Sequence, residues 1–446
     1  MQHSSIHHRL QVLAVWAIAS LIGLLIFNLG GLDTPQTYWS AAKPSYLQHV
    51  AFWDSEWYYR VATQGYPDSI SLPIGQDGRV GQNTWAFMPI YAYLSGGLAK
   101  LLSANYYTCA VVVAWLGSAL AALGLDAWMR PRVGKAASLL GVAIFFTCGP
   151  AIILQLPYAE SLGLALVAIG FAVLAKRRFA WAMVVFVLAA FTRPIGVPLG
   201  AALGLWWVWE ELRARGLIST SRFDASFSSA RVYADADPYA ANYDAAPGET
   251  PPIPSPAPAP QALPSFTPMD LSPMPLSSKD RLWLFVTAAV TCAAALTWPL
   301  LAWIATGRMS AYVDTETAWR GVDLAPFEAW INRSASFGGA HAGVIGLFGV
   351  LVLSACILGW RQLRQLGRLT WIWCVCYWVY LLIFFDPSSS VFRMLLMVAP
   401  LAWAVAVKLV SRPRAALAVL TVGVVTQVLW VAWVWDYGSI SILWVP

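Results

Sequence analysis

The chain has 446 residues, of which 59% are hydrophobic and 11% are charged, and it contains 25 tryptophans. This composition excludes an ordinary soluble globular protein, and its repeated long apolar segments indicate a polytopic membrane protein. The net charge of +6 comes from short Lys/Arg clusters between those segments. That pattern is typical of membrane topology rather than of nucleic-acid binding. The six cysteines lie in or beside apolar segments, so we interpret them as small buried hydrophobic residues.

The first apolar segment, 10–32, predicts a retained transmembrane span that follows a cytoplasmic, basic N-terminus. The first external loop then covers 33–105, and its segment 85–102 is apolar but interrupted by Pro89, Gly96 and Gly97. If this segment crossed the membrane, the basic residues around Arg130 would fall on the outer face. We therefore predict an interfacial or re-entrant helix on the outer side.

Hydropathy and charge bias together predict an all-α protein with about eleven spans and an external C-terminus. The remaining predicted spans are 106–129, 136–154, 161–175, 179–191, 197–212, 282–305, 344–360, 369–385, 394–410 and 415–435. This divides the chain into an N-terminal half, 1–215, and a C-terminal half, 280–446, with a second external loop at 306–341. The sequence shows no obvious internal repeat, which weighs mildly against the inverted-repeat transporters.

Between the halves, residues 216–279 are rich in Pro, Ala and Ser. This composition predicts a disordered cytoplasmic insertion with polyproline II character, because it cannot bury a core. We interpret the insertion as a tolerated linker, and the alternative is a docking platform for partners.

The stretch 52–60 is the most unusual part of the first loop, because acids, an arginine and aromatic residues crowd into it. Carboxylates at a membrane surface are costly unless they are solvated or paired, so Asp54 and Glu56 indicate a site. An aromatic belt at the water interface would account for the Trp and Tyr residues equally well.

Acids and arginines that topology does not require collect on the predicted outer face. Arginine binds phosphate bidentately, and a nearby carboxylate can take a proton from an attacking hydroxyl, so the pattern suits a reaction on an anionic, lipid-borne substrate. Taken singly, Arg193 or Arg393 can also snorkel from a helix end. The outer set comprises Asp54, Glu56, Arg60, Glu160, Arg193, Asp314, Glu316 and Arg393.

Several motifs resemble those of the PIG-V family, whose eukaryotic members are the second mannosyltransferases of GPI-anchor assembly and which has bacterial homologues. In the first loop the similar residues are Trp53-Asp54-Ser55-Glu56-Trp57-Tyr58, Ala62, Gly65-Tyr66 and Ala86-Phe87-Met88-Pro89-Ile90-Tyr91. Further similar motifs follow in the family's order at 158–162, 192–196, 312–319, 392–394 and 399–401. The resemblance covers most of the chain except the insertion, and Met88 and Met394 depart from the family pattern.

The resemblance implies a GT-C glycosyltransferase fold and inverting transfer of mannose from a polyprenyl phosphate, such as dolichyl phosphate mannose, to form an α-mannoside. It implies that Asp54 is the essential acid, as general base or by orienting the acceptor hydroxyl. Arg193 and Arg393, with Arg60 in reserve, are the candidates for holding the donor phosphate. The candidate sugar- and acceptor-binding residues are Trp53, Glu56, Trp57, Tyr58, Tyr158, Glu160, Asp314, Glu316 and Trp319.

Some properties stay open at this point. The aromatic residues can brace the loop rather than stack on sugars, and Asp314 and Glu316 can simply solvate theirs. No metal site is predicted and no cofactor is required, although assistance by a divalent cation stays open. The acceptor can be a lipid, a glycan or a protein. We expect the protein in the plasma membrane, with its active site on the extracytoplasmic side.

Three rival functions account for parts of the sequence. A transporter or channel predicts polar residues in the middle of several spans, which the hydropathy pattern does not favour. A scaffold that binds partners through the proline-rich insertion leaves the outer acids and arginines without a role. Another GT-C enzyme, with arabinose or glucose as the donor sugar, fits the sequence as well, because sugar choice depends on pocket shape.

Overall fold

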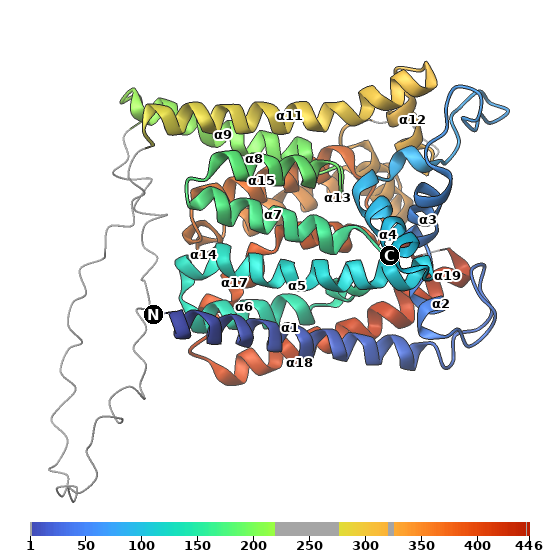
Figure 1. Cartoon of the computed structure of the whole chain (residues 1–446), viewed down its shortest axis with the longest axis horizontal. Coiled ribbons are helices and arrows are strands. Elements are labelled where there is room, and N and C mark those ends of the chain that lie inside the picture. Colours follow the sequence, from blue (N-terminus) through green and yellow to red (C-terminus); the bar gives the residue numbers. More distant parts are fainter. Residues whose placement is uncertain (1, 219–275, 320–324, 443) are drawn as a thin grey trace, which may run out of the picture.

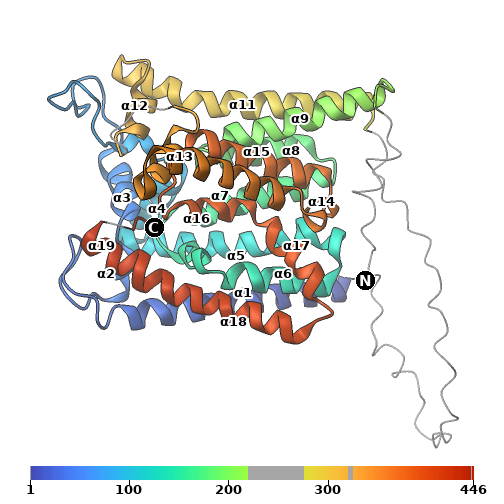
Figure 2. The ribbon, with the colours of Figure 1, turned by 180° about the vertical axis from the view of Figure 1, so that it is seen from behind.

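The computed structural model describes residues 2–218, 276–319, 325–442 and 444–446. Within these ranges the chain is a bundle of long helices that run alongside one another (Figures 1 and 2). The bundle helices are α1 (Gln2–Gly30), α5 (Tyr106–Val133), α6 (Lys135–Thr147), α7 (Glu160–Ala175), α8 (Phe179–Ala190), α9 (Gly196–Ala214), α11 (Ser278–Thr306), α13 (Glu328–Leu358), α15 (Arg368–Phe384), α17 (Pro400–Leu409) and α18 (Pro413–Leu429).

The two ends of the bundle differ. The N-terminus and the short helix α14 (Arg361–Gln365) lie at one end, which we call the basic end (Figure 1). The C-terminus lies at the other end, which we call the loop end, together with a group of short helices. These are α2 (Tyr46–Val50), α3 (Asp54–Gln64), α4 (Pro89–Leu102), α12 (Ala311–Thr317) and α19 (Gly438–Ser441).

Several described helices have the length and composition to cross a membrane. Five pass this test: α1 from Ile6, α5, α11, α13, and α18 with its continuation to Ser441. Two bent pairs raise the number to seven if each is one span: α6 with η2 (Gly149–Gln155), bent by 84°, and Val391–Val398 with α17, bent by 69°. The shorter apolar helices α7, α8 and α15 lie in the same bundle. The chain therefore has the helices of a multi-pass membrane protein, while the count of eleven stays a prediction.

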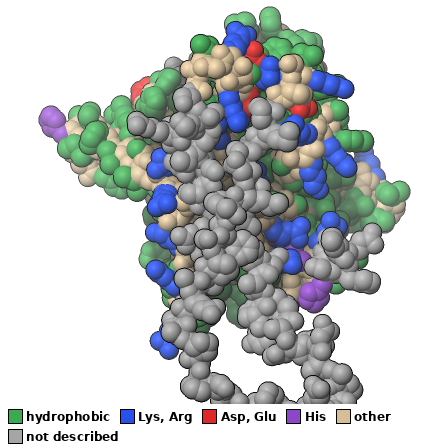
Figure 3. All heavy atoms as spheres, turned by 90° about the vertical axis from the view of Figure 1, so that its left-hand side faces the viewer, with side chains coloured by type: hydrophobic (Ala, Val, Ile, Leu, Met, Phe, Trp, Pro, Cys, Tyr) green, Lys and Arg blue, Asp and Glu red, His purple; other side chains and the backbone are tan. Residues whose placement is uncertain are grey.

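The basic end carries the Lys/Arg clusters that the sequence pattern placed on one side. Figure 3 shows Lys and Arg side chains gathered around this face. They lie in the last turns of α5 and α9, directly after α7 and α9, and within α14, at Arg130, Arg132, Lys176, Arg178, Arg213, Arg215, Arg361 and Arg364. Because positive residues are retained in the cytoplasm, we expect the loop end to face the outside.

Some predicted segments differ from the structure. The second external loop, predicted at 306–341, contains α12 and the first part of α13, which starts at Glu328. The helix is broken at Gly338 and Gly339, where Gly339 has a φ of 79° that favours glycine. Arg393, predicted in a loop, lies in the short helix α16 (Val391–Met394). Helix α4 has 14 residues and lies at the loop end. Its predicted position at the membrane interface stays a prediction.

Glycines bring α5 and α7 close together, which places the start of α7. A Cβ atom on Gly117 would lie 3.0 Å from the backbone nitrogen of Leu162, and one on Gly124 would lie 3.0 Å from the side chain of Ile169. Small residues at such positions let membrane helices approach closely. The first residue of α7, Glu160, is consequently 1% exposed.

The helices on either side of the predicted insertion pack against each other. Glu211 near the end of α9 accepts a hydrogen bond from Nε of Arg281 in α11, at 3.0 Å. The insertion itself, predicted at 216–279, lies mostly outside the described residues.

Candidate active site

Asp54 is the first residue of α3, at a turn that an unusual backbone conformation creates. Trp53 has φ 62° and ψ −124°, a region that residues with side chains rarely adopt. The buried Tyr158 holds this turn from both sides: its hydroxyl donates to the carbonyl of Phe52 at 3.1 Å and accepts from the backbone N–H of Asp54 at 3.2 Å. The negative charge of Asp54 also suits a helix N-terminus.

Four charged residues from separate parts of the chain meet at this turn, and we call them the charged quartet: Asp54, Glu160, Arg193 and Arg393. Nη1 of Arg393 lies 2.7 Å from Oδ2 of Asp54, and its Nε lies 3.2 Å from Oε1 of Glu160. Nη1 of Arg193 lies 2.6 Å from the same Glu160 oxygen. The four side chains come from α3, α7, the connection between α8 and α9, and α16. Sequence reasoning named all four, and the structure brings them together.

The quartet is buried, with Asp54 as its most accessible member. The side chain of Asp54 is 28% exposed, those of Arg193 and Arg393 are 8% exposed, and that of Glu160 is 1% exposed. Two carboxylates balance two guanidinium groups, and such pairing is what allows charges to be buried. Burial lowers the pKa of Arg193, but the Glu160 carboxylate together with Tyr58 and Tyr377 outweighs this effect, so the pKa is raised.

The quartet retains polar atoms that can bind a further ligand. Among the described residues, Oε2 of Glu160, Nε of Arg193 and Oγ of Ser161 are buried without a hydrogen-bond partner. Buried polar atoms are normally satisfied, so these atoms mark a place for water or a polar substrate group.

Tyrosine side chains surround the quartet. The Arg393 guanidinium lies 5.3 Å from the ring centre of Tyr158. Tyr58 is one turn after Asp54 on α3, and burial, followed by the Glu160 carboxylate, raises the pKa of its hydroxyl. Tyr58 therefore stays protonated as a hydrogen-bond donor. The hydroxyl of Tyr377 on α15 donates to the carbonyl of Met394, next to Arg393, at 3.0 Å. Sequence reasoning missed Tyr377, because one tyrosine in an apolar span gives no signal.

Glu56 and Arg60 form a separate pair. Nε of Arg60 lies 3.0 Å from Oε1 of Glu56, and the hydroxyl of Tyr107 donates to Oε2 of Glu56 at 3.0 Å. The Arg60 guanidinium also lies 4.8 Å from the ring centre of Trp57. The structure thus places Arg60 with Glu56 rather than with the quartet, and nothing in this geometry supports a contact with the donor phosphate.

Aromatic contacts join the two external loops. Trp57 stacks on Phe87 with ring centres 5.7 Å apart, and the edge of Trp319 from the second loop meets Trp57 at 5.3 Å. Trp53 packs on Trp39 at 4.8 Å. These contacts fit a bracing role for Trp53 and Trp57, while sugar binding by these residues stays a prediction.

Asp314 and Glu316 lie on α12, outside the quartet. Asp314 accepts a hydrogen bond from the exposed Ser310 hydroxyl at 2.6 Å. Burial, followed by the neighbouring Glu316 carboxylate, raises the pKa of Tyr312. The amide of Asn83 donates to the hydroxyl of Thr315 at 2.8 Å, which fixes α12 against the first loop. The contacts of Asp314 suit a local structural role, and its substrate contact stays a prediction.

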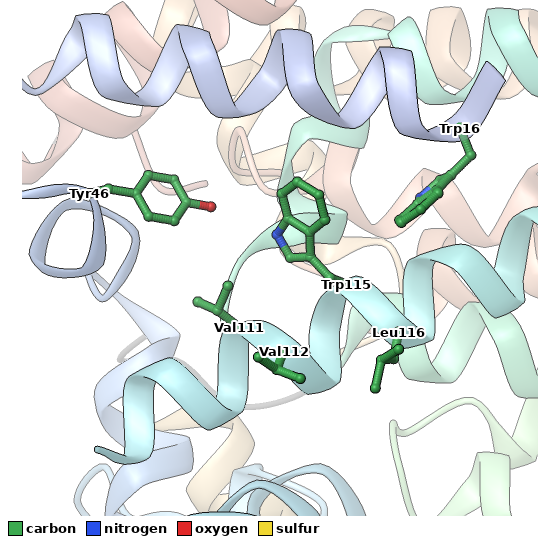
Figure 4. A pocket seen from close by; sticks show the side chains of 6 residues that line it. All are labelled: Trp16, Tyr46, Val111, Val112, Trp115 and Leu116. Carbon is green, nitrogen blue, oxygen red and sulfur yellow. The ribbon is translucent and has the colours of Figure 1, made fainter. Parts of the chain in front are cut away.

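An apolar pocket of about 430 Å³ lies against α1 and α5, and no member of the quartet lines it. Figure 4 shows the residues that line it: Trp16, Tyr46, Val111, Val112, Trp115 and Leu116. Tyr46 and Val111 also pack against the apolar residues around Tyr158. In the part of the chain that the structure describes, no group of three or more His, Cys, Asp or Glu residues is arranged to hold a metal ion.

The fold and the site thus define a helical protein of membrane-span character with a buried, charge-balanced group at one end. In comparisons with known proteins, no family model and no curated protein matches the chain. One similar solved structure is the Archaeoglobus fulgidus oligosaccharyltransferase, crystallised with a tethered acceptor peptide that contains the NVT sequon. The TM-score is 0.47 and the sequence identity 13%, over 96% of this chain and 55% of that one. This chain therefore spans about half of that protein's length. The PIG-V resemblance rests on the motifs alone.

Proposed function

We propose that the chain is a membrane glycosyltransferase that transfers mannose from a polyprenyl-phosphate donor to an acceptor at the extracytoplasmic surface. The observation that carries this proposal is the composition of the quartet. Each of its members comes from a different motif of the PIG-V resemblance: Asp54 from the first loop, Glu160 from 158–162, Arg193 from 192–196 and Arg393 from 392–394. Motifs far apart in sequence thus supply one group of interacting side chains.

The chemistry follows from the charges. The acceptor hydroxyl attacks C1 of the mannose from the face opposite the phosphate and loses its proton to Asp54. The bond between C1 and the phosphate oxygen breaks with inversion, so a β-linked donor gives an α-mannoside. The lipid phosphate keeps the bonding electrons, and Arg393 and Arg193 stabilise the charge that develops on it.

Arg393 has two partners in this scheme. Without substrate its guanidinium neutralises Asp54, at 2.7 Å. A bound phosphate competes with Asp54 for the guanidinium, because both are oxygen anions. Donor binding therefore releases the Asp54 carboxylate to accept a proton, while Glu160 keeps both arginines in place.

The surroundings of the quartet suit a lipid-borne donor. The site lies at one end of an apolar bundle, and two residues that line the pocket in Figure 4, Tyr46 and Val111, pack against the apolar residues around Tyr158. It lies opposite the basic end, so the positive-inside rule favours a position outside the plasma membrane.

The test is transfer of radiolabelled mannose from polyprenyl phosphate to membrane acceptors by the full chain. We expect Asp54→Asn to lose about 10²- to 10⁴-fold in rate, the usual contribution of a general base. The matched control is Asp77→Asn, which changes a carboxylate in the same loop that is 65% exposed and faces Arg79 instead of the quartet. Full activity of Asp54→Asn would remove this residue from the mechanism. The same assay with polyprenyl-phosphate donors that carry glucose or arabinose tests the identity of the donor sugar. A clear preference for one of them would replace the mannose assignment.

A further inference from the structure

His49 and Asp436 form a buried pair near the site, although 387 residues separate them. Nε2 of His49 in α2 lies 2.5 Å from Oδ1 of Asp436 in η5 (Trp430–Tyr437), a π-helical continuation of α18. Nδ1 of His49 lies 2.9 Å from the carbonyl oxygen of Phe27 in α1. The side chain of His49 is 0% exposed. The pair therefore joins three elements that are distant in sequence.

The two oxygen atoms that face His49 determine how many protons the pair must carry. A neutral imidazole has one N–H, but both ring nitrogens of His49 face oxygens. Either His49 carries both protons, or Asp436 carries one of them. In both cases the pair has no net charge and satisfies both contacts, which makes it suitable for burial. Asp33 is a further charged group near Asp436, and the Thr34 hydroxyl donates to the carbonyl of Gly30 at 2.7 Å.

Neighbouring residues extend the pair toward the first loop. The indole N–H of Trp435 donates to the carbonyl of His49 at 3.0 Å. The ring of Phe52 lies parallel to Trp435, with centres 6.1 Å apart and 4° between the planes. A Cβ atom on Gly30 would lie 2.9 Å from Cγ1 of Val431, 3.2 Å from Oδ2 of Asp436 and 3.4 Å from Cε1 of His49, so a side chain at this position would crowd the pair.

The segment between α2 and Asp54 transmits this fixation. The carbonyl of Phe52 accepts a hydrogen bond from the Tyr158 hydroxyl, and Trp53 has a positive φ. The hydroxyl of Ser55 donates to the carbonyl of Val50 at 3.2 Å. A positive φ at a bulky residue is strained and persists only where surrounding contacts enforce it. The position of α2 therefore determines the backbone turn at Trp53, and this turn determines where the Asp54 side chain points.

We propose that His49 and Asp436 are positioning residues that fix α2 and thereby hold Asp54 against Arg393. Neither residue has a contact with the quartet among the interactions described above, so the pair acts through the backbone of 50–54. The inference depends on the proposed function only for its activity readout.

A matched control is present at the basic end of the bundle. His8 in α1 and Asp126 in α5 are also buried, with Nε2 and Oδ1 2.9 Å apart, and the Ser138 hydroxyl donates to the same oxygen. Asp126→Asn breaks a buried histidine–carboxylate pair without touching the first loop. It separates a general loss of stability from a loss of positioning.

The experiment compares Asp436→Asn with Asp126→Asn in the full chain, purified in detergent. Both variants are expected to lower the thermal unfolding midpoint. Only Asp436→Asn is expected to speed hydrogen exchange of peptides within 46–64, by about tenfold or more. In the transfer assay it should lower kcat by about tenfold and leave the KM for the donor nearly unchanged, because the arginines stay in place.

Equal exchange of 46–64 in the two variants would overturn the proposal, as would unchanged exchange in Asp436→Asn. If that variant does not fold, Gly30→Ala is the second variant, because its methyl group would crowd Val431 and the pair from α1. It should likewise speed hydrogen exchange within 46–64. The exchange measurement needs no activity. Absence of mannose transfer by the wild type would therefore reject the proposed function and leave this inference to be decided on its own.

Discussion

At the scale of single residues, Glu160 is the member of the quartet that makes the burial of two arginines possible. Its carboxylate contacts Arg193 at 2.6 Å and Arg393 at 3.2 Å, and it is 1% exposed. Removing one partner of a buried ion pair leaves an uncompensated charge, which is far more costly than losing an exposed pair. Asp54 is expected to contribute less to stability, because its side chain is 28% exposed and water can solvate it.

We therefore expect Glu160→Gln to lower the free energy of unfolding by about 3–5 kcal/mol, as for other broken buried pairs. Asp54→Asn should lower the free energy of unfolding by much less, while it lowers the transfer rate by about 10²- to 10⁴-fold. Chemical denaturation in detergent measures the first quantity and the mannose transfer assay the second. A Glu160→Gln variant as stable as the wild type would show that the two arginines do not depend on this carboxylate.

The members of the site differ in how far the sequence could predict them. Asp54, Glu160, Arg193 and Arg393 stood in recognisable motifs on the predicted outer face. The spacing of Glu56 and Arg60 is that of an i, i+4 ion pair on a helix, which could have signalled that they bind each other. His49 and Asp436 gave no such signal, because their pairing depends on the contact between the two ends of the chain.

At the scale of elements, the packing of α5 on α7 controls where the quartet forms. Gly117 faces the backbone of Leu162, two residues after Glu160. A backbone atom cannot rotate away as a side chain can, so any side chain at 117 moves the first turn of α7.

We predict that Gly117→Ala lowers both the thermal unfolding midpoint and the transfer rate. The control is Gly97→Ala in α4, where no atom lies within 4 Å of the added Cβ. That change should be neutral or raise stability by up to about 1 kcal/mol, because alanine favours the helix. Identical behaviour of the two variants in thermal unfolding and in transfer would contradict this role of Gly117.

Hydropathy predicted the helical segments well and their breaks poorly. The ends of α5, α8 and α15 lie within a few residues of the predicted limits. By contrast, the start of α13 was missed, because Gly338 and Gly339 and the polar residues before them suggested a loop. The π-helical turn η5 was also invisible, since its residues continue an apolar segment and only packing selects the wider turn.

At the scale of the whole molecule, the insertion can be tested as a spacer. Glu211 and Arg281 pair directly, so α9 and α11 meet without the help of residues 219–275. We expect a chain that lacks 219–275, joined by a short Gly/Ser linker, to keep its thermal unfolding midpoint and its transfer activity. Loss of activity with unchanged stability would favour the alternative role of the insertion as a docking platform.

The class of the fold was predictable, but the arrangement was not. Apolar segments and basic clusters sufficed to indicate an all-α membrane protein, and the outer position of its charged residues stays a prediction. They could not show that α6 (Lys135–Thr147) bends by 84° into η2, and this bend precedes the turn from which Glu160 starts α7. Bends of this kind arise from contacts between helices, which one-dimensional hydropathy does not contain.

The meeting of the two chain ends also dictates when the site can exist during synthesis. Arg393 follows Asp54 by 339 residues and Asp436 follows His49 by 387. At ribosomal rates of about 5–20 residues per second, the first loop waits on the order of 20–70 s for its arginine partner. Throughout that interval the carboxylate of Asp54 lacks its arginine partner, and of the contacts to this turn only those from residues already made, such as Tyr158, can form. The charged quartet is therefore completed in one late step, and a chain truncated before Arg393 lacks it.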